Sequence, residues 1–159
     1  AIQVANYFLD AGKIIVSVKD RNGKITDRYV SQGNNYPKVP IAVLVNNGSA
    51  SASEIVAAAL KDNNRAILVG QRTFGKGSVQ RGFSLSNGGT VFLTIAHYLT
   101  PSGKDIHKVG IEPNIVVQES TNTSRKVEAK AYTLTEMEVD TNDPVIKAAL
   151  ENITKNQKK

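Results

Sequence analysis

The 159-residue chain contains no cysteine and no tryptophan. Without cysteine it cannot carry a disulfide scaffold, a cysteine-ligated zinc or iron-sulfur site, or a thiol nucleophile. Long hydrophobic runs are missing as well. The longest are Ile41 to Val45 and Ile55 to Leu60, and both are far shorter than the roughly 20 residues of a transmembrane helix. The sequence therefore predicts no membrane-spanning helix and no thiol chemistry.

The composition is that of one globular domain with a basic surplus. Hydrophobic residues make up 40% of the chain, and the formal net charge is +6, so a single core is expected. Residues 1–118 hold 13 Lys and Arg against 7 acidic residues, whereas residues 119–159 hold 7 of each. The basic residues alternate with apolar, acidic or turn residues and lack interleaved aromatics. This pattern favours a solvated sheet face over a nucleic-acid groove, and no nucleic-acid partner is predicted.

The hydrophobic pattern predicts an α/β fold. Residues 41–45 are continuously apolar, as in a strand buried on both faces. Residues 51–63 have helical spacing, and residues 66–69 form a second apolar run. This order predicts a βαβ unit with two parallel strands. In such units the ligand-binding and catalytic residues lie beyond the carboxyl ends of the strands. In this chain the loops at those ends are residues 46–51 and 70–77.

Turn signals place the remaining elements. Asn22-Gly23 predicts a hairpin between the runs 13–19 and 25–30, after an N-terminal stretch with helical spacing. Further strands are expected over 79–85, 90–99 and 115–117. Asp143-Pro144 predicts the start of a final helix. We divide the chain into a core, residues 1–118, and an extension, residues 119–159, with a strand-like segment and the C-terminal helix.

The first candidate for chemistry is the segment Gly48-Ser49-Ala50-Ser51-Ala52-Ser53-Glu54. Its structural interpretation is a capping box, in which Ser51 caps the helix and Glu54 reaches back to it. Its functional interpretation is a serine nucleophile at a helix N-terminus, where backbone N–H groups stabilise an oxyanion. Both place Ser51 at the same point of the fold, and the residues alone leave the choice open.

The second candidate is the segment Gly70-Gln71-Arg72-Thr73-Phe74-Gly75-Lys76-Gly77. It approaches the phosphate-binding pattern G-x-x-x-x-G-K-[ST], but Gly77 replaces the hydroxyl residue, and a strand-like pattern follows instead of a helix. Nucleotide binding is therefore a distant alternative. The other interpretation makes Lys76 a general base for Ser51, which requires a dry pocket that lowers the pKa of the amine. Gln80 is placed to orient this amine without adding charge.

The only histidines are His97 and His107. Neither follows a strand end in the way that a Ser-His-Asp arrangement would need. Together with Asp105 they also fall short of a convincing metal-ligand set. Both are interpreted as structural or surface residues, and no metal site is predicted.

Several segments of the sequence together resemble the carboxyl-terminal processing proteases, also called tail-specific proteases. The resemblance covers about residues 1–118. It rests on residues 48–55, 61–62, 69–70, 73–80, 88–89, 94–96, 100–103 and 110–113. It implies a mixed β-sheet with a βαβ core, of the ClpP/crotonase-like protease type.

The resemblance also implies roles for individual residues. Ser51 corresponds to the nucleophile, Lys76 to the base, and Gln80 to the residue that completes the arrangement. The backbone N–H of Ala52 corresponds to an oxyanion-hole donor, and Asp62 to an acid that we interpret as structural. The implied protein is a serine endopeptidase with a Ser-Lys dyad, which cleaves proteins with unstructured tails near their C-termini and needs no cofactor or metal.

The resemblance carries further expectations. The family works in the bacterial periplasm or cell envelope, with a plastid thylakoid lumen as the alternative, and a homo-oligomer is left open. His97 replaces a usual arginine, and Asn114 replaces a usual aspartate, from which we expect altered packing. The family has a PDZ domain and a Gly-Gly loop upstream of the matched region, and the chain begins at Ala1. We therefore expect a piece of a longer protein that is slow or inactive alone. A non-catalytic binding or assembly module of the same fold is the alternative function.

Overall fold

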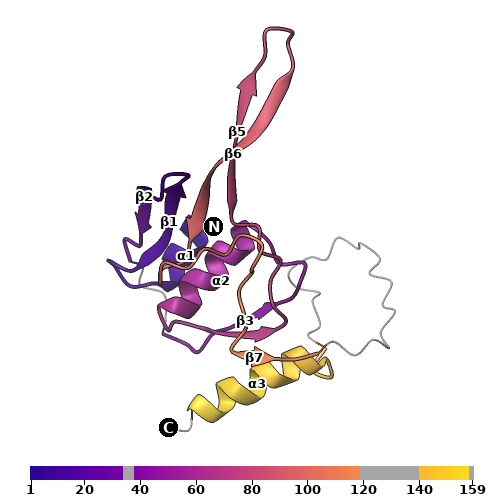
Figure 1. Cartoon of the computed structure of the whole chain (residues 1–159). Coiled ribbons are helices and arrows are strands. Elements are labelled where there is room, and N and C mark those ends of the chain that lie inside the picture. The colour runs from indigo at the N-terminus through magenta and orange to yellow at the C-terminus, as the bar shows by residue number, and fades with distance from the viewer. Residues whose placement is uncertain (34–37, 119–139, 158–159) are drawn as a thin grey trace.

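The computed structural model describes residues 1–33, 38–118 and 140–157. The strand-like part of the predicted extension, within 119–139, lies outside these residues. Figure 1 shows the helices and strands of these residues arranged around the central helix α2. The elements are α1 (Ile2–Phe8), β1 (Ile14–Asp20), β2 (Ile25–Val30), β3 (Ala42–Val45), α2 (Ala52–Asp62), β4 (Ile67–Gly70), β5 (Ser78–Ser84), β6 (Thr90–Leu99), β7 (Ile115–Val116) and α3 (Pro144–Gln157).

Four strands form an antiparallel sheet in the order β2-β1-β6-β5. The hairpin predicted at Asn22-Gly23 is present, and Gly23 has the positive φ of 84° that this turn requires. The Asp20 carboxylate closes the turn by accepting from the backbone N–H groups of Asn22 and Lys24, both at 2.9 Å. The β5–β6 hairpin extends far from the body of the molecule (Figure 1), and residues 81–94 are all exposed.

The predicted βαβ unit lies in a second, parallel sheet, with the order β3-β4-β7. β3 and β4 pair in parallel register from Ala42 with Ile67 to Val45 with Gly70. The prediction that β3 is buried on both faces is wrong, because Leu44 is 46% exposed. β3 is an edge strand of this small sheet, and it borders α3 and a hollow that Leu44 lines together with Val145 and Ile146.

Helix α2 joins the two sheets because it has buried residues on both sides. Ile55, Ala59 and Leu60 pack with α1 and β1, in a cluster that contains Leu9 and Ile15. On the other side Ala57 and Ala58 share a second cluster with Val45, Leu68, Ile106 and Ile111. Small alanine side chains allow close approach of the helix to the parallel sheet. The N-terminus of α2 is thereby fixed between the two sheets.

The final helix begins as predicted. The Asp143 carboxylate accepts from the N–H groups of Val145 and Ile146 at 2.8 and 3.2 Å, and Pro144 occupies the first helical position. α3 lies against β3 and β4. Within the described residues, no helix combines the length and the apolar character needed to cross a bilayer.

Candidate active site

Ser51 lies at a sharp turn between the end of β3 and the start of α2. Asn46 stabilises this turn, because its side-chain oxygen accepts from Gly48 N–H at 3.0 Å and its carbonyl accepts from Ser49 N–H at 3.0 Å. Ser51 itself has φ 55° and ψ −112°, a conformation that is unfavourable for a residue with a side chain. The fold therefore holds Ser51 under backbone strain at the helix N-terminus.

Glu54 is the central residue of this region. Its side chain is completely buried, and its carboxylate accepts four hydrogen bonds. Oε2 accepts from the backbone N–H groups of Ser51 at 2.9 Å and Lys76 at 2.8 Å. Oε1 accepts from Thr73 Oγ1 at 2.5 Å and Gly75 N–H at 2.7 Å. One carboxylate thus connects the two loops that the sequence singled out.

The predicted capping box describes only part of this arrangement. Both halves of the capping box are present: the Ser51 side chain faces the Glu54 backbone N–H, and the Glu54 carboxylate accepts from Ser51 N–H. The other three hydrogen bonds of Glu54 come from the 73–76 segment, which the local S-x-x-E pattern does not predict.

Thr73 extends the connection to a third loop. Its hydroxyl donates to Glu54 and accepts from Ile111 N–H at 2.8 Å, and it is buried. Phe74 N–H also donates to the Ser49 carbonyl at 2.9 Å, which joins the two loops a second time. Thr73 is a site-building residue that sequence reasoning missed. Its place at the start of segment 73–80, one of those on which the family resemblance rests, was the available signal.

The glycines on either side of Lys76 allow this segment to lie directly on the loop 106–110. A Cβ on Gly75, which has φ 89°, would lie 2.8 Å from Gly110 N. A Cβ on Gly77 would lie 2.8 Å from His107 N. The Gly75 carbonyl accepts from Lys108 N–H at 2.8 Å. The backbone of Lys76 is therefore fixed from both sides.

The side chains of Lys76 and Gln80 are both exposed. The expectation that Lys76 lies in a dry pocket is not met, because the residues described around it leave its side chain in solvent. Gln80 lies in β5, which begins at Ser78. The structure therefore brings the Lys76 backbone to the Ser51 turn, while the Lys76 side chain stays exposed.

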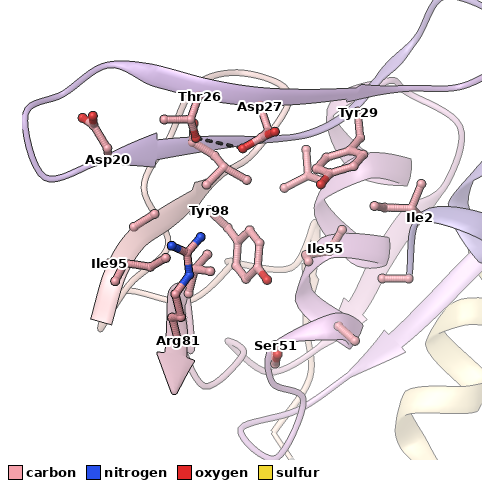
Figure 2. Close-up of a pocket in the computed structure, with 16 residues that line it drawn as sticks. Ile2, Asp20, Thr26, Asp27, Tyr29, Ser51, Ile55, Arg81, Ile95 and Tyr98 are labelled. Atoms are coloured by element: carbon pink, nitrogen blue, oxygen red, sulfur yellow. Dashed lines mark hydrogen bonds between the residues drawn. The ribbon is translucent and has the colours of Figure 1, made fainter. Parts of the chain in front are cut away.

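Ser51 and Ala52 line a groove of about 590 Å³ (Figure 2). Its walls come from α1, β1, β2, β5, β6 and α2. Ser51 lies at one end, beside Ile55 and Tyr98, and Arg81 reaches in from β5. Within the described residues, the Ala52 N–H has no protein acceptor. The groove therefore offers an apolar surface that leads to a serine and an available backbone donor.

The remaining candidates lie elsewhere. Asp62, at the end of α2, accepts from Ser102 N–H at 3.0 Å and so anchors a loop. His97 contacts Asp105 outside the groove, with Nδ1 2.9 Å from Oδ2.

Among the described residues, no group of three or more acidic or histidine side chains is placed to hold a metal ion. The segment 70–77 leads into strand β5, whereas the phosphate-binding pattern requires a helix there.

The sequence comparison decides the family. Residues 1–117 match peptidase family S41. The chain belongs to this family. It is 47% identical over 114 residues to the chloroplastic carboxyl-terminal-processing peptidase 3 of Arabidopsis thaliana, covering 72% of this chain and 22% of that protein. It is 46% identical over 118 residues to the carboxyl-terminal-processing protease of Synechocystis sp., covering 74% of this chain and 27% of that protein.

The fold agrees with this assignment to family S41. A solved photosystem II D1 C-terminal processing protease superposes with a TM-score of 0.69 at 44% identity, covering 74% of this chain and 30% of that one. The predicted resemblance and the α/β fold with a βαβ core are thus confirmed. The S41 chain spans about a quarter of the length of these curated relatives.

Proposed function

We propose that the chain carries the Ser-Lys dyad of a serine endopeptidase that cleaves proteins near their C-termini. The observation that supports this most is the Glu54 carboxylate, one oxygen of which accepts from both Ser51 N–H and Lys76 N–H. A buried charge with four donors is a rigid connection. It fixes the backbones of the two proposed dyad residues relative to each other.

In the proposed mechanism Ser51 attacks the scissile carbonyl carbon while Lys76 takes its proton. The tetrahedral oxyanion is stabilised by the Ala52 N–H and by the N-terminus of α2. Lys76 then returns the proton to the leaving amine, and an acyl-enzyme forms on Ser51. Water attacks this ester with Lys76 again as the base, which regenerates the serine. Gln80 orients the lysine amine.

The mechanism requires Lys76 to act as a neutral amine. An ordinary lysine, with a pKa near 10.4, is neutral in roughly one molecule in 10³ to 10⁴ at pH 7. The side chain of Lys76 is exposed among the described residues. Desolvation must therefore come from bound substrate or from protein outside these residues. An extended peptide that lies across the Ser51 groove is one such source, because it would exclude water from the dyad.

The proposed substrates are protein chains with unstructured C-terminal tails. The names of the Arabidopsis and Synechocystis relatives describe processing of carboxyl termini. The groove at Ser51 is lined mainly by apolar residues (Figure 2), which suits the side chains of an unfolded peptide better than a folded polar surface. The proposed location is a bacterial cell envelope, with a plastid lumen as the alternative. No metal or cofactor takes part in the proposed steps.

The test compares four alanine variants in the full-length protein, with a fluorescently labelled unstructured protein as the substrate. Ser51→Ala and Lys76→Ala should each abolish cleavage. Ser53→Ala and Lys104→Ala are matched controls, because both residues are exposed and neither side chain makes a hydrogen bond among the described residues; they should cleave at the unmodified rate. Full activity of Ser51→Ala or Lys76→Ala would refute the proposed dyad.

A non-catalytic binding or assembly module of the same fold is the second candidate. The exposed Lys76 amine favours it, because a solvated lysine is a poor base. Mass spectrometry after treatment with a fluorophosphonate separates the two candidates. A label on Ser51 that is absent from Lys76→Ala would rule out the module. Substrate binding without cleavage or labelling would support it.

A further inference from the structure

Outside the groove, four side chains form a cluster between β6 and the loop that follows it. His97 Nδ1 lies 2.9 Å from Asp105 Oδ2, and Lys19 Nζ lies 3.4 Å from the same oxygen. Asp105 Oδ1 accepts from His107 N–H at 2.9 Å. The rings of His97 and His107 are 4.5 Å apart. His107 Nδ1 is buried and has no partner among the described residues.

This cluster supports the segment that contains Lys76. His97 is the Cα partner of Ser78 in the β5–β6 ladder, two residues after Lys76. The Gly77 carbonyl accepts from Tyr98 N–H at 2.7 Å, and Gly77 itself packs against the backbone of His107. Asp105 pairs with Leu99 in an isolated bridge at the start of the loop. The His97–Asp105 contact therefore joins β6 to the loop on which the Lys76 segment lies.

Histidine is the side chain in this cluster whose charge changes near neutral pH. From β1 and its turn, Lys19, Asp20 and Arg21 line the hollow beside His97. From β5, the facing residue is the uncharged Ser78. From the loop come Asp105, His107 and the neighbouring Lys108. Burial alone would raise the pKa of Asp105, but hydrogen bonds from His107 N–H and His97, with the charges of His97 and Lys19, hold it below its ordinary value of 3.8.

The carboxylate of Asp105 thus stays charged at neutral pH. With His97 protonated, the contact is an ion pair supported by a charge-assisted hydrogen bond. With His97 neutral, only a weaker hydrogen bond remains, and Lys19 is left as the cation on Asp105. Two charged imidazole rings at the observed separation would repel each other. The strength of the attachment between β6 and the loop therefore depends on one proton.

We propose that His97 and Asp105 are positioning residues for Lys76, and that protonation of His97 tightens the 105–110 loop against the Lys76 segment. This inference rests on the proposed peptidase function. An arginine at position 97 would keep the attachment charged at every pH. Histidine makes the attachment dependent on pH in this chain.

The first test follows cleavage of a labelled unstructured protein by the full-length enzyme and its His97→Arg variant from pH 5.5 to 8.5. The ratio of the two kcat values removes pH effects that are common to both proteins. We expect kcat of the unmodified enzyme to match that of the variant at pH 5.5 and to fall several-fold below it at pH 8.5. His107→Gln should keep the pH dependence of the unmodified enzyme. A ratio that does not change with pH would overturn the inference, and so would loss of the dependence in His107→Gln.

The second test does not require catalysis. Hydrogen exchange, corrected for the intrinsic rate at each pH, is measured by NMR at the amides of Lys108 and Tyr98, which donate to the carbonyls beside Lys76. Protection should fall from pH 5.5 to 8.5 in the unmodified protein and stay constant in His97→Arg. If His97→Arg does not fold, Asp105→Asn replaces it as the comparison variant. The amides of Lys108 and Tyr98 should then show low protection from hydrogen exchange at both pH values.

The two ideas fail in different ways. pH-dependent protection without cleavage would refute the proposed peptidase while leaving the attachment in place. Cleavage with protection that is the same at every pH in the unmodified protein would refute the attachment while leaving the peptidase in place.

Discussion

Ser51 and Lys76 are 25 residues apart in the sequence, yet their backbone N–H groups donate to the same carboxylate oxygen, at 2.9 and 2.8 Å. The oxygen belongs to Glu54, which is completely buried. Because a carboxylate accepts about four hydrogen bonds, the four donors around Glu54 satisfy it fully. The two loops of the candidate active site are therefore parts of one polar network and cannot shift independently.

Glu54→Gln should destabilise the protein by about 3 kcal/mol and strongly reduce cleavage. An amide has one acceptor oxygen, so its NH₂ group would face two N–H or O–H donors and leave them unpaired in the core. Urea denaturation gives the change in the free energy of unfolding. Glu112→Gln is the matched control, because its exposed pair with Arg72 should contribute less than about 1 kcal/mol. Equal effects of the two substitutions would contradict the central role of Glu54.

Gly75→Ala and Gly88→Ala separate steric contact from backbone strain. Both glycines have positive φ, 89° and 84°. A Cβ on Gly75 would lie 2.8 Å from Gly110 N, whereas a Cβ on Gly88 would meet nothing within 4 Å. We expect losses of about 3 kcal/mol at Gly75 and about 1 kcal/mol at Gly88. Only the first should affect cleavage. Thermal unfolding and activity assays check both, and similar losses would show that the close approach is unimportant.

Ser51→Gly should be more stable than Ser51→Ala by about 1 kcal/mol, although both variants lose the proposed nucleophile. Glycine adopts the φ of 55° found at this position without the strain imposed by a Cβ. Its larger entropy in the unfolded chain offsets part of that gain. Denaturant unfolding of the two variants measures the difference. A less stable glycine variant would mean that the turn stores no strain.

Asp105 should contribute to stability at neutral pH and lose this contribution in acid. Its pKa is lower in the folded protein than its ordinary value of 3.8. The contribution is therefore present above the unfolded pKa and disappears as pH falls through the folded pKa. Asp105→Asn should lower the free energy of unfolding by at most about 1 kcal/mol at pH 7, because the carboxylate is partly exposed. The difference should shrink below about pH 4, and a difference that grows in acid would contradict the sign.

The sequence predicted those elements that have local signals. Asn22-Gly23 indicated the first hairpin because a two-residue turn with positive φ needs such residues. Asp143-Pro144 indicated the start of α3 because the helix cap is formed by residues next to it. The apolar run at β3 was predicted correctly as a strand, but not its exposure. Burial depends on the neighbours of a strand, and Leu44 lies in an edge strand.

For the candidate site, too, the sequence predicted some features and the tertiary structure decided the others. The sequence by itself determined the family, the strand-helix-strand order that places loops 46–51 and 70–77 at one edge, and the identity of the serine and lysine in them. Only the tertiary structure decided that Glu54 joins these loops, because three of its four donors are 19 to 22 residues away in the chain. It also decided that Lys76 remains exposed. Composition indicates which residues can carry charge, whereas desolvation is a property of everything packed around them.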